Sequence, residues 1–147
     1  MAGYNRVLVA VDMTPEADEV LSTAHKVADD NGAELQCLTV VKPINYAYSG
    51  YESVGAYTAI PAFEEELQAS ARSSLNAKAK EMGLDPSKCD VQVGRPASTI
   101  KDYAQSQGVD LIVMGSHCRH GLGLLLGSTA TGVLHGAPCD VLTVRVT

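Results

Sequence analysis

Residues 111–131 read LIVMGSHCRHGLGLLLGSTAT, and the interpretation of the whole chain starts from this stretch. An apolar run of strand length ends at Gly115, a loop with Gly121 and Gly123 follows, and Gly127-Ser128 opens a segment of helical character. Glycines let backbone amides approach an anion without a Cβ in the way, and the first N–H groups of a helix lack internal partners. The pattern therefore predicts a strand, a phosphate-binding loop and a helix.

Two well-known phosphate loops do not fit this stretch. The Walker pattern requires a lysine directly after its second glycine, whereas Ser128 follows Gly127. The dinucleotide fingerprint requires three spaced glycines after an early strand, and the run from Gly121 to Leu126 lacks the third. A flexible connection that happens to precede a helix remains the alternative interpretation.

Length and composition indicate one domain, residues 1–147, with a single core, because the chain has 147 residues of which 46% are hydrophobic. No apolar run approaches the ~20 residues of a membrane span, and the first six residues, MAGYNR, lack the apolar stretch of a secretory signal. We therefore expect a cytoplasmic protein with no membrane segment.

The charge balance argues against nucleic acid as a partner. Seventeen acidic and eleven basic residues give a net charge of −6, and no cluster of lysine or arginine stands out. Affinity for duplex nucleic acid comes largely from basic side chains that neutralise phosphates. A small phosphorylated ligand needs only local donors and is compatible with this composition.

The four cysteines are Cys37, Cys89, Cys118 and Cys139, and none forms a CxxC pair. Free thiols are the expectation for a cytoplasmic protein, and Cys37 and Cys89 lie in strand-like runs that predict buried packing. Cys118 is either an inert substitution or a reactive thiol, because Arg119, His120 and a helix N-terminus could lower its pKa.

Neither a metal site nor a catalytic centre is predicted. Nothing in the sequence brings the first group of possible ligands, His117, Cys118 and His120, beside the second group, His135 and Cys139. The chain also shows no Ser-His-acid order, no paired carboxylates and no acidic pair suited to a magnesium-dependent hydrolase.

Strand and helix patterns alternate along the chain. Strands are expected over residues 6–12, 34–41, 90–93, 111–114 and 141–146, and helices are expected to begin at positions 15, 61, 96 and 128. Thr14 is expected to cap the first helix, and the second is expected to bury a stripe that includes Phe63, Leu67 and Leu75. Residues 42–60 hold four tyrosines and predict a long irregular insertion, which either covers a site or interface or is an ordinary surface loop.

This alternation predicts a parallel sheet with helices on both faces. Ligands bind such sheets beyond the carboxyl ends of the strands, where the winding direction reverses. If the first and fourth strands are central neighbours, that crevice lies between Asp12 and Gly115. Asp12 can accept a hydrogen bond from a ribose hydroxyl or an adenine amino group, or it can be a turn acid that caps the first helix. Ser128 can likewise hold an anion or act as an N-cap.

The chain resembles the universal stress protein family over nearly its whole length. The matching segments are VLVAVD at 7–12, TPE at 14–16, GRP at 94–96, GVDLIVMGSH at 108–117, GS at 127–128 and PCDVLTVR at 138–145. The resemblance implies an α/β fold: a single-domain flavodoxin-like, adenine-nucleotide alpha-hydrolase-like three-layer sandwich with a five-stranded parallel sheet in the order 3-2-1-4-5. It also implies a homodimer that pairs the C-terminal strands, Val141 to Val146.

Members of this family that bind ATP carry Gly-x-x-Gly, nine residues, and then Gly-Ser or Gly-Thr. Here Cys118 stands where the second glycine is expected, and eight residues, 119–126, precede Gly127-Ser128. Gly121 and Gly123 could restore the room that the Cys118 side chain takes.

The resemblance implies ATP or a related adenine nucleotide as the ligand, bound as a sensor or regulator of the stress response. Its implied contacts are Asp12 and Val40 on the adenine and ribose side, Gly121 in the loop, and Gly115, Gly127, Ser128 and Thr129 on the phosphates. Any enzymatic activity would be weak ATP hydrolysis or autophosphorylation. The alternative is a nucleotide-free dimeric interaction module with a degenerate phosphate loop.

Overall fold

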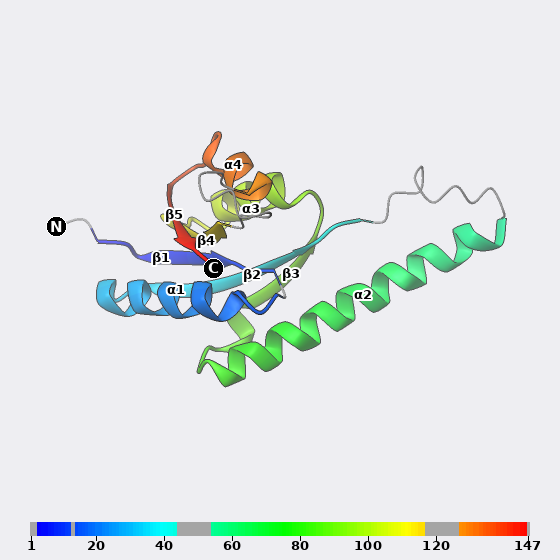
Figure 1. The fold of residues 1–147 in the computed structure, drawn as a ribbon, viewed down its shortest axis with the longest axis horizontal. Helices are drawn as coiled ribbons and strands as arrows, with labels where there is room; N and C mark the ends of the chain where they lie inside the picture. The colour runs from blue at the N-terminus through cyan, green and yellow to red at the C-terminus, as the bar shows by residue number, and fades with distance from the viewer. Residues whose placement is uncertain (1–2, 13, 44–53, 117–126, 147) are drawn as a thin grey trace.

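A five-stranded, fully parallel sheet forms the centre of the computed structural model, which describes residues 3–12, 14–43, 54–116 and 127–146, with side chains omitted for 54–63 (Figure 1). The strands run in the order β3-β2-β1-β4-β5, which confirms the expected order. Their bounds are β1 (Arg6–Ala10), β2 (Glu34–Val41), β3 (Cys89–Val93), β4 (Leu111–Ser116) and β5 (Asp140–Arg145).

In the described part of the chain, four α-helices cover the two faces of the sheet. They are α1 (Ala17–Asn31), α2 (Val54–Glu81), α3 (Pro96–Ser106) and α4 (Ser128–Leu134), and a short 3-10 turn, η1 (Pro86–Lys88), precedes β3. Figure 1 shows α1 and α2 on one side of the sheet and α3 and α4 on the other. This is the three-layer α/β sandwich that the sequence predicts.

Side-chain alternation along the strands explains the two layers of core. Val7 and Val9 of β1 pack into the core under α1 and α2, whereas Leu8 and Ala10 pack into the core under α3 and α4. Successive side chains of a strand point to opposite faces of a sheet, so a strand buried on both faces reads as a continuous apolar run.

The predicted starts of the first two helices are wrong. Helix α1 begins at Ala17, not at position 15, because the Thr14 carbonyl accepts the Ala17 N–H (3.0 Å) in a turn and the Thr14 hydroxyl bonds Asp12 instead of capping the helix. Helix α2 begins at Val54, so residues 54–60 are helical and the irregular insertion is shorter than expected. Pro61 therefore lies inside α2 and not at its first position. Of the four tyrosines, Tyr46, Tyr48 and Tyr51 lie outside the described residues.

The expected buried stripe of α2 is only partly correct. Leu75 and Ala79 are buried against the sheet, whereas Leu67 is 38% exposed. Figure 1 shows that the N-terminal half of α2 extends past the edge of the sheet, and Leu67 lies at the end of that half. Apolar periodicity predicts which face of a helix is buried, but it does not predict where the underlying sheet ends.

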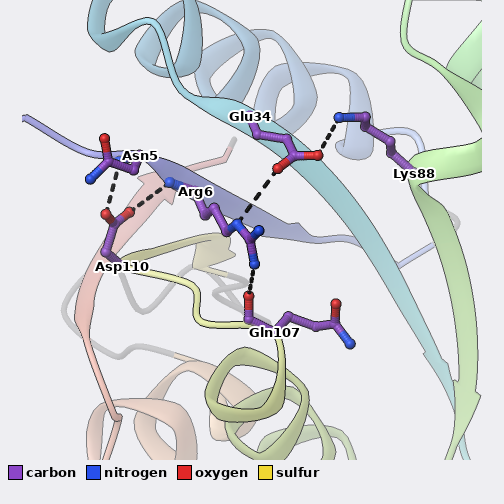
Figure 2. Close-up of polar contacts among 6 residues, drawn as sticks. All are labelled: Asn5, Arg6, Glu34, Lys88, Gln107 and Asp110. Atoms are coloured by element: carbon purple, nitrogen blue, oxygen red, sulfur yellow. Dashed lines mark hydrogen bonds and ion pairs between the residues drawn. The ribbon is translucent and has the colours of Figure 1, made fainter.

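Polar contacts tie the strands together at their amino ends (Figure 2). The Asp110 carboxylate accepts the backbone N–H groups of Asn5 (2.8 Å) and Arg6 (3.0 Å), and Arg6 Nη1 donates to the Gln107 carbonyl (2.6 Å). These contacts join the start of β1 to the turn that leads into β4. They fix the relative position of the two central strands.

A second group of contacts extends this network across β2 to η1. Glu34 Oε2 lies 3.6 Å from Arg6 Nε, and Glu34 Oε1 accepts a hydrogen bond from Lys88 Nζ (Figure 2). The hydrogen bond from Lys88 holds the pKa of the Glu34 carboxyl below its usual value. The amino ends of four neighbouring segments are thus fastened by charged side chains.

Candidate functional site

A cavity of about 790 Å³ opens at the carboxyl ends of the strands, the edge opposite to these polar contacts. Its volume falls within the roughly 300–1,000 Å³ of small-molecule sites. It lies where the order of the sheet reverses between β1 and β4, the position at which open α/β sheets bind ligands. Its lining includes Ala10, Val11, Asp12, Thr14, Glu16, Leu38, Val40, Lys42, Pro96, Ile100, Met114, Gly115, Gly127, Ser128 and Thr129.

Six of the seven predicted site residues line this one cavity: Asp12, Val40, Gly115, Gly127, Ser128 and Thr129. They come from four separate stretches of the chain, and the fold brings them together. The seventh predicted residue, Gly121, lies outside the described residues, as does Cys118.

Asp12 is placed by hydrogen bonds from β2. The Val11 N–H donates to the Leu38 carbonyl (3.0 Å), and the buried Thr39 hydroxyl donates to the Val11 carbonyl (2.6 Å). These bonds hold the chain in line with β2 for one residue beyond β1. Asp12 follows directly, and its Oδ1 accepts a hydrogen bond from the Thr14 hydroxyl (2.6 Å). The side chain is therefore held in the role of a turn acid while it also lines the cavity.

The other wall of the cavity is the first turn of α4. Gly127 is the N-cap residue, with extended backbone, and its carbonyl accepts the Thr131 N–H (3.0 Å). Ser128 is therefore the first helical residue and not the N-cap that its sequence position allowed. The first N–H groups of a helix have no intrahelical partner, so the amides of Ser128, Thr129 and Ala130 supply donors beside the cavity.

Close packing between α3 and α4 sets the position of this turn. A Cβ added at Gly132 would lie only 2.6 Å from the Ala97 Cβ, so the two helices approach at a spacing that excludes a larger residue. At the other end of α4, Lys101 Nζ donates to the His135 carbonyl (2.8 Å). A small residue in α4 and a cation from α3 thus hold the helix in place.

Strand β4 continues further toward the cavity than predicted, to Ser116. Gly115 pairs with Val144 of β5, and the Ser116 hydroxyl donates to the Val144 carbonyl (3.3 Å). Gly115 lines the cavity with backbone atoms alone, because it has no side chain.

Lys42 is a site residue that the sequence reasoning missed. It follows β2 directly and is the only lysine or arginine among the described residues that line the cavity. Its place at the carboxyl end of a central strand is the same signal that singled out Asp12. Asp12 and Glu16 contribute two carboxylates against this one ammonium group. A phosphorylated ligand would therefore depend on backbone N–H groups and Lys42 for its anionic contacts.

Two further observations concern the described residues alone. Within them, no three histidine, cysteine or acidic side chains are grouped so that they could hold a metal ion. No helix in the described part of the chain has both the length and the apolar character needed to cross a membrane.

Comparison with known proteins places these features in a family. The model of the universal stress protein family matches residues 3–145. The chain is 36% identical over 147 residues to universal stress protein A homolog 2 of Coxiella burnetii, covering 99% of this chain and 98% of that protein.

Solved structures show the same architecture. UspA from Lactobacillus plantarum matches with a TM-score of 0.79 at 27% identity, covering 99% of this chain and 100% of that one. A universal stress protein crystallised in complex with cAMP matches with a TM-score of 0.59 at 23% identity, covering 97% of this chain and 98% of that one, and this likeness concerns the fold. The chain belongs to the universal stress protein family.

Proposed function

We propose that residues 1–147 form one universal stress protein domain that binds ATP or a related adenine nucleotide as a sensor or regulator in the cytoplasm. The observation that carries this proposal is the cavity of about 790 Å³, lined by Asp12 and Val40 on one side and by Gly115, Gly127 and Ser128 on the other. A relative of the same fold was crystallised with cAMP, which supports an adenine nucleotide as the class of ligand.

The lining suggests how the ligand lies. Val40 offers an apolar surface for the base, and the Asp12 carboxylate, beside it in the cavity, accepts from a ribose hydroxyl or an adenine amino group. The amides of Ser128 and Thr129 and the open backbone at Gly115 receive the phosphates. This proposal concerns binding and assigns no residue to catalysis.

Calorimetric titration with ATP, ADP, AMP and cAMP tests the proposal. We expect saturable heat with at least one of these ligands, and we expect Asp12→Ala to weaken binding by roughly 10- to 100-fold, since a hydrogen bond to a charged group is worth about 1.5–3 kcal/mol. Asp30→Ala is the matched control, because it removes the same charge from an exposed position near the end of α1 that faces away from the cavity. Equal loss in both variants contradicts the contact assigned to Asp12, and no heat and no melting shift at millimolar ligand contradicts nucleotide binding.

The departure from the family motif at Cys118 favours the second candidate function, a nucleotide-free interaction module. The test is Cys118→Gly, which restores the glycine of the ATP-binding members. If the wild-type chain binds no nucleotide and this single change creates ATP binding, the module is the correct interpretation. If the wild-type chain binds a nucleotide, Cys118 is compatible with a functional phosphate-binding loop.

We also propose that the protein is a homodimer that pairs β5 with β5 of a second copy. Strand β5 lies at one end of the sheet, and its apolar residues Val141, Leu142 and Val144 are only partly buried. An unpaired apolar edge strand is a site of association that a partner covers.

Sedimentation velocity checks the proposed dimer. Val144→Lys on β5 is expected to dissociate it. Val93→Lys is the matched control, because Val93 is a 43% exposed valine on β3, the opposite edge strand. A monomeric wild-type chain, or dissociation by the β3 variant alone, contradicts pairing through β5.

A further inference from the structure

We propose that Cys37 and Cys89 form a redox-active thiol pair, which hydrogen peroxide converts into an intramolecular disulfide between β2 and β3. This inference is independent of the nucleotide proposal, because neither Cys37 nor Cys89 lines the cavity. It rests on the placement of the two thiols and on the groups that contact Cys89.

The two cysteines are direct cross-strand partners. Strands β2 and β3 are parallel, and their register pairs Cys37 with Cys89. Neighbouring strands lie about 4.7–4.9 Å apart, which is within the roughly 4.4–6.8 Å between Cα atoms that a disulfide spans. Both side chains point to the same face, since both belong to the core under α1 and α2. The backbone therefore places the two sulfurs side by side.

The two thiols differ in their surroundings, which gives them different roles. A hydrogen bond from the Cys37 thiol lowers the pKa of Cys89, and the nearby Arg72 cation acts in the same direction, although burial and Asp85 oppose both. The same hydrogen bond, together with burial, raises the pKa of Cys37. Arg72 is close because its Nη1 donates to the Cys89 carbonyl (3.5 Å). Because the Arg72 cation lies beside Cys89 and Cys89 stands at the start of an edge strand, we assign Cys89 as the nucleophile of the pair and Cys37 as the resolving thiol.

Cys89 is also the thiol that an oxidant reaches first. It is the first residue of β3, an edge strand, and follows the short η1 turn, whereas Cys37 lies within the longer strand β2. The Cys89 thiol donates a hydrogen bond to the carbonyl of Asp85 at 3.6 Å, and Asp85 is the N-cap residue of η1. Since Cys89 is only 5% exposed, oxidation requires η1 to open locally.

The reaction balances with one peroxide for each pair. The Cys89 thiolate attacks one peroxide oxygen, and the O–O bond breaks to give a sulfenic acid and hydroxide. The proton that Cys89 lost on ionisation returns to the hydroxide, which leaves as the first water. The Cys37 sulfur then attacks the sulfenic sulfur, the S–O bond breaks, and the Cys37 proton leaves with the hydroxyl as a second water. Two thiols lose two electrons and two protons in total, and peroxide is reduced to two waters.

The disulfide would close a loop from residue 37 to residue 89, which contains all of α2, and would fasten β3 to the sheet. Closing a loop of this length restricts the unfolded chain, so we expect the melting temperature to rise by roughly 5–15 °C on oxidation. The residues of β2 that line the cavity, Leu38 and Val40, point to the face opposite Cys37. Oxidation is therefore expected to leave any nucleotide affinity within twofold.

Disulfide mapping on the wild-type chain tests the proposal without any substitution. The reduced protein is treated with a small excess of hydrogen peroxide, blocked with an alkylating reagent, digested and examined by mass spectrometry. We expect a peptide pair that joins Cys37 to Cys89, a loss of two thiols for each chain, and full reversal by dithiothreitol. Oxidation of Cys139 or Cys118 while Cys37 and Cys89 stay reduced would overturn the proposal, as would a Cys89 that proceeds to sulfinic acid with Cys37 intact.

Two variants sharpen the assignment of roles. In Cys37→Ala, Cys89 is expected to stop at the sulfenic acid, which dimedone traps, because the resolving thiol is gone. Cys139→Ser is the control, since Cys139 is a half-buried thiol before β5 and should leave the disulfide yield unchanged. Loss of the disulfide in Cys139→Ser, or equal dimedone labelling of the wild-type chain and Cys37→Ala, contradicts the assigned pair.

Discussion

Replacement of Gly132 by alanine tests whether the contact between α3 and α4 sets the cavity wall. The new Cβ would lie 2.6 Å from the Ala97 Cβ, whereas carbon atoms pack best at about 3.5–4.0 Å. Both atoms are attached directly to helical backbone, so no side-chain rotation relieves the clash, and α4 must move away from α3 by about 1 Å.

Two opposing free-energy contributions decide the stability of Gly132→Ala: the cost of the clash and the higher helix propensity of alanine. Overpacking of this kind costs about 1–3 kcal/mol, and the rigid contact at Gly132 favours the upper part of that range. Alanine gains up to about 1 kcal/mol over glycine inside a helix. The net change is a loss of about 1–2 kcal/mol in the free energy of unfolding, which corresponds to a fall of about 3–8 °C in melting temperature. The first turn of α4 moves with the helix, so the affinity for any nucleotide falls as well.

Differential scanning calorimetry on four proteins provides the assay. Thr131→Ala is an exposed control on the same helix, and it should leave the melting temperature nearly unchanged. In the double variant Gly132→Ala/Ala97→Gly the close contact is gone, and we expect recovery of most of the stability lost in Gly132→Ala. An unchanged or higher melting temperature in Gly132→Ala, or no recovery in the double variant, would refute the packing argument.

Three further outcomes follow from single contacts. Thr39→Val removes the hydroxyl that donates to the Val11 carbonyl at 2.6 Å, and urea denaturation is expected to show a loss of about 1–2 kcal/mol, together with weaker binding of any ligand that contacts Asp12. Leu75→Ala, at a position 1% exposed, is expected to cost about 2–5 kcal/mol, whereas Leu67→Ala on the same helix, 38% exposed, should cost less than about 1 kcal/mol in the same assay. The pKa of Glu34 is lowered in the folded chain, so its contribution to stability is present above the ordinary glutamate pKa of about 4.3 and is lost as the pH falls through the lower folded value. Melting temperatures of Glu34→Gln should accordingly fall less steeply with acid below about pH 4.3 than those of the wild-type chain, and parallel curves would count against this ion pair.

The parallel sheet could be predicted because its central strands β1 and β4 are buried on both faces, whereas the order of the strands was what the family resemblance implied. Such strands read as unbroken apolar runs, as Val7 to Ala10 and Leu111 to Met114 do, and their alternation with helices leaves few topologies. The site followed from the same rule, since Asp12 and Gly115 each come directly after such a run. At Asp12 and Gly115 the apolar pattern of the sequence predicts the same position at the carboxyl end of the sheet that the fold gives them.

The sequence predictions were wrong where one local pattern is compatible with more than one structure. Thr14 followed by Pro15 is a pattern typical of a helix N-terminus. In the structure the Thr14 hydroxyl instead donates a hydrogen bond to the Asp12 carboxylate, and the helix begins at Ala17. Leu67 has the period of a buried residue, yet it is 38% exposed in the half of α2 that extends past the edge of the sheet. The roles of Thr39 and Gly132 depend on contacts with residues 28 and 35 positions away, and no local pattern encodes those contacts.

The two ends of the sheet are stabilised in different ways, and this difference explains why the cavity stays open. At the amino ends, Arg6, Glu34 and Asp110 join neighbouring segments through charged contacts, so register is fixed there. At the carboxyl ends, the chain uses backbone bonds, such as the one from Val11 to Leu38, and a glycine contact between helices. These devices hold the strands and α4 in place without filling the space between them. The sheet can therefore keep a ligand-sized opening at one edge without losing its register.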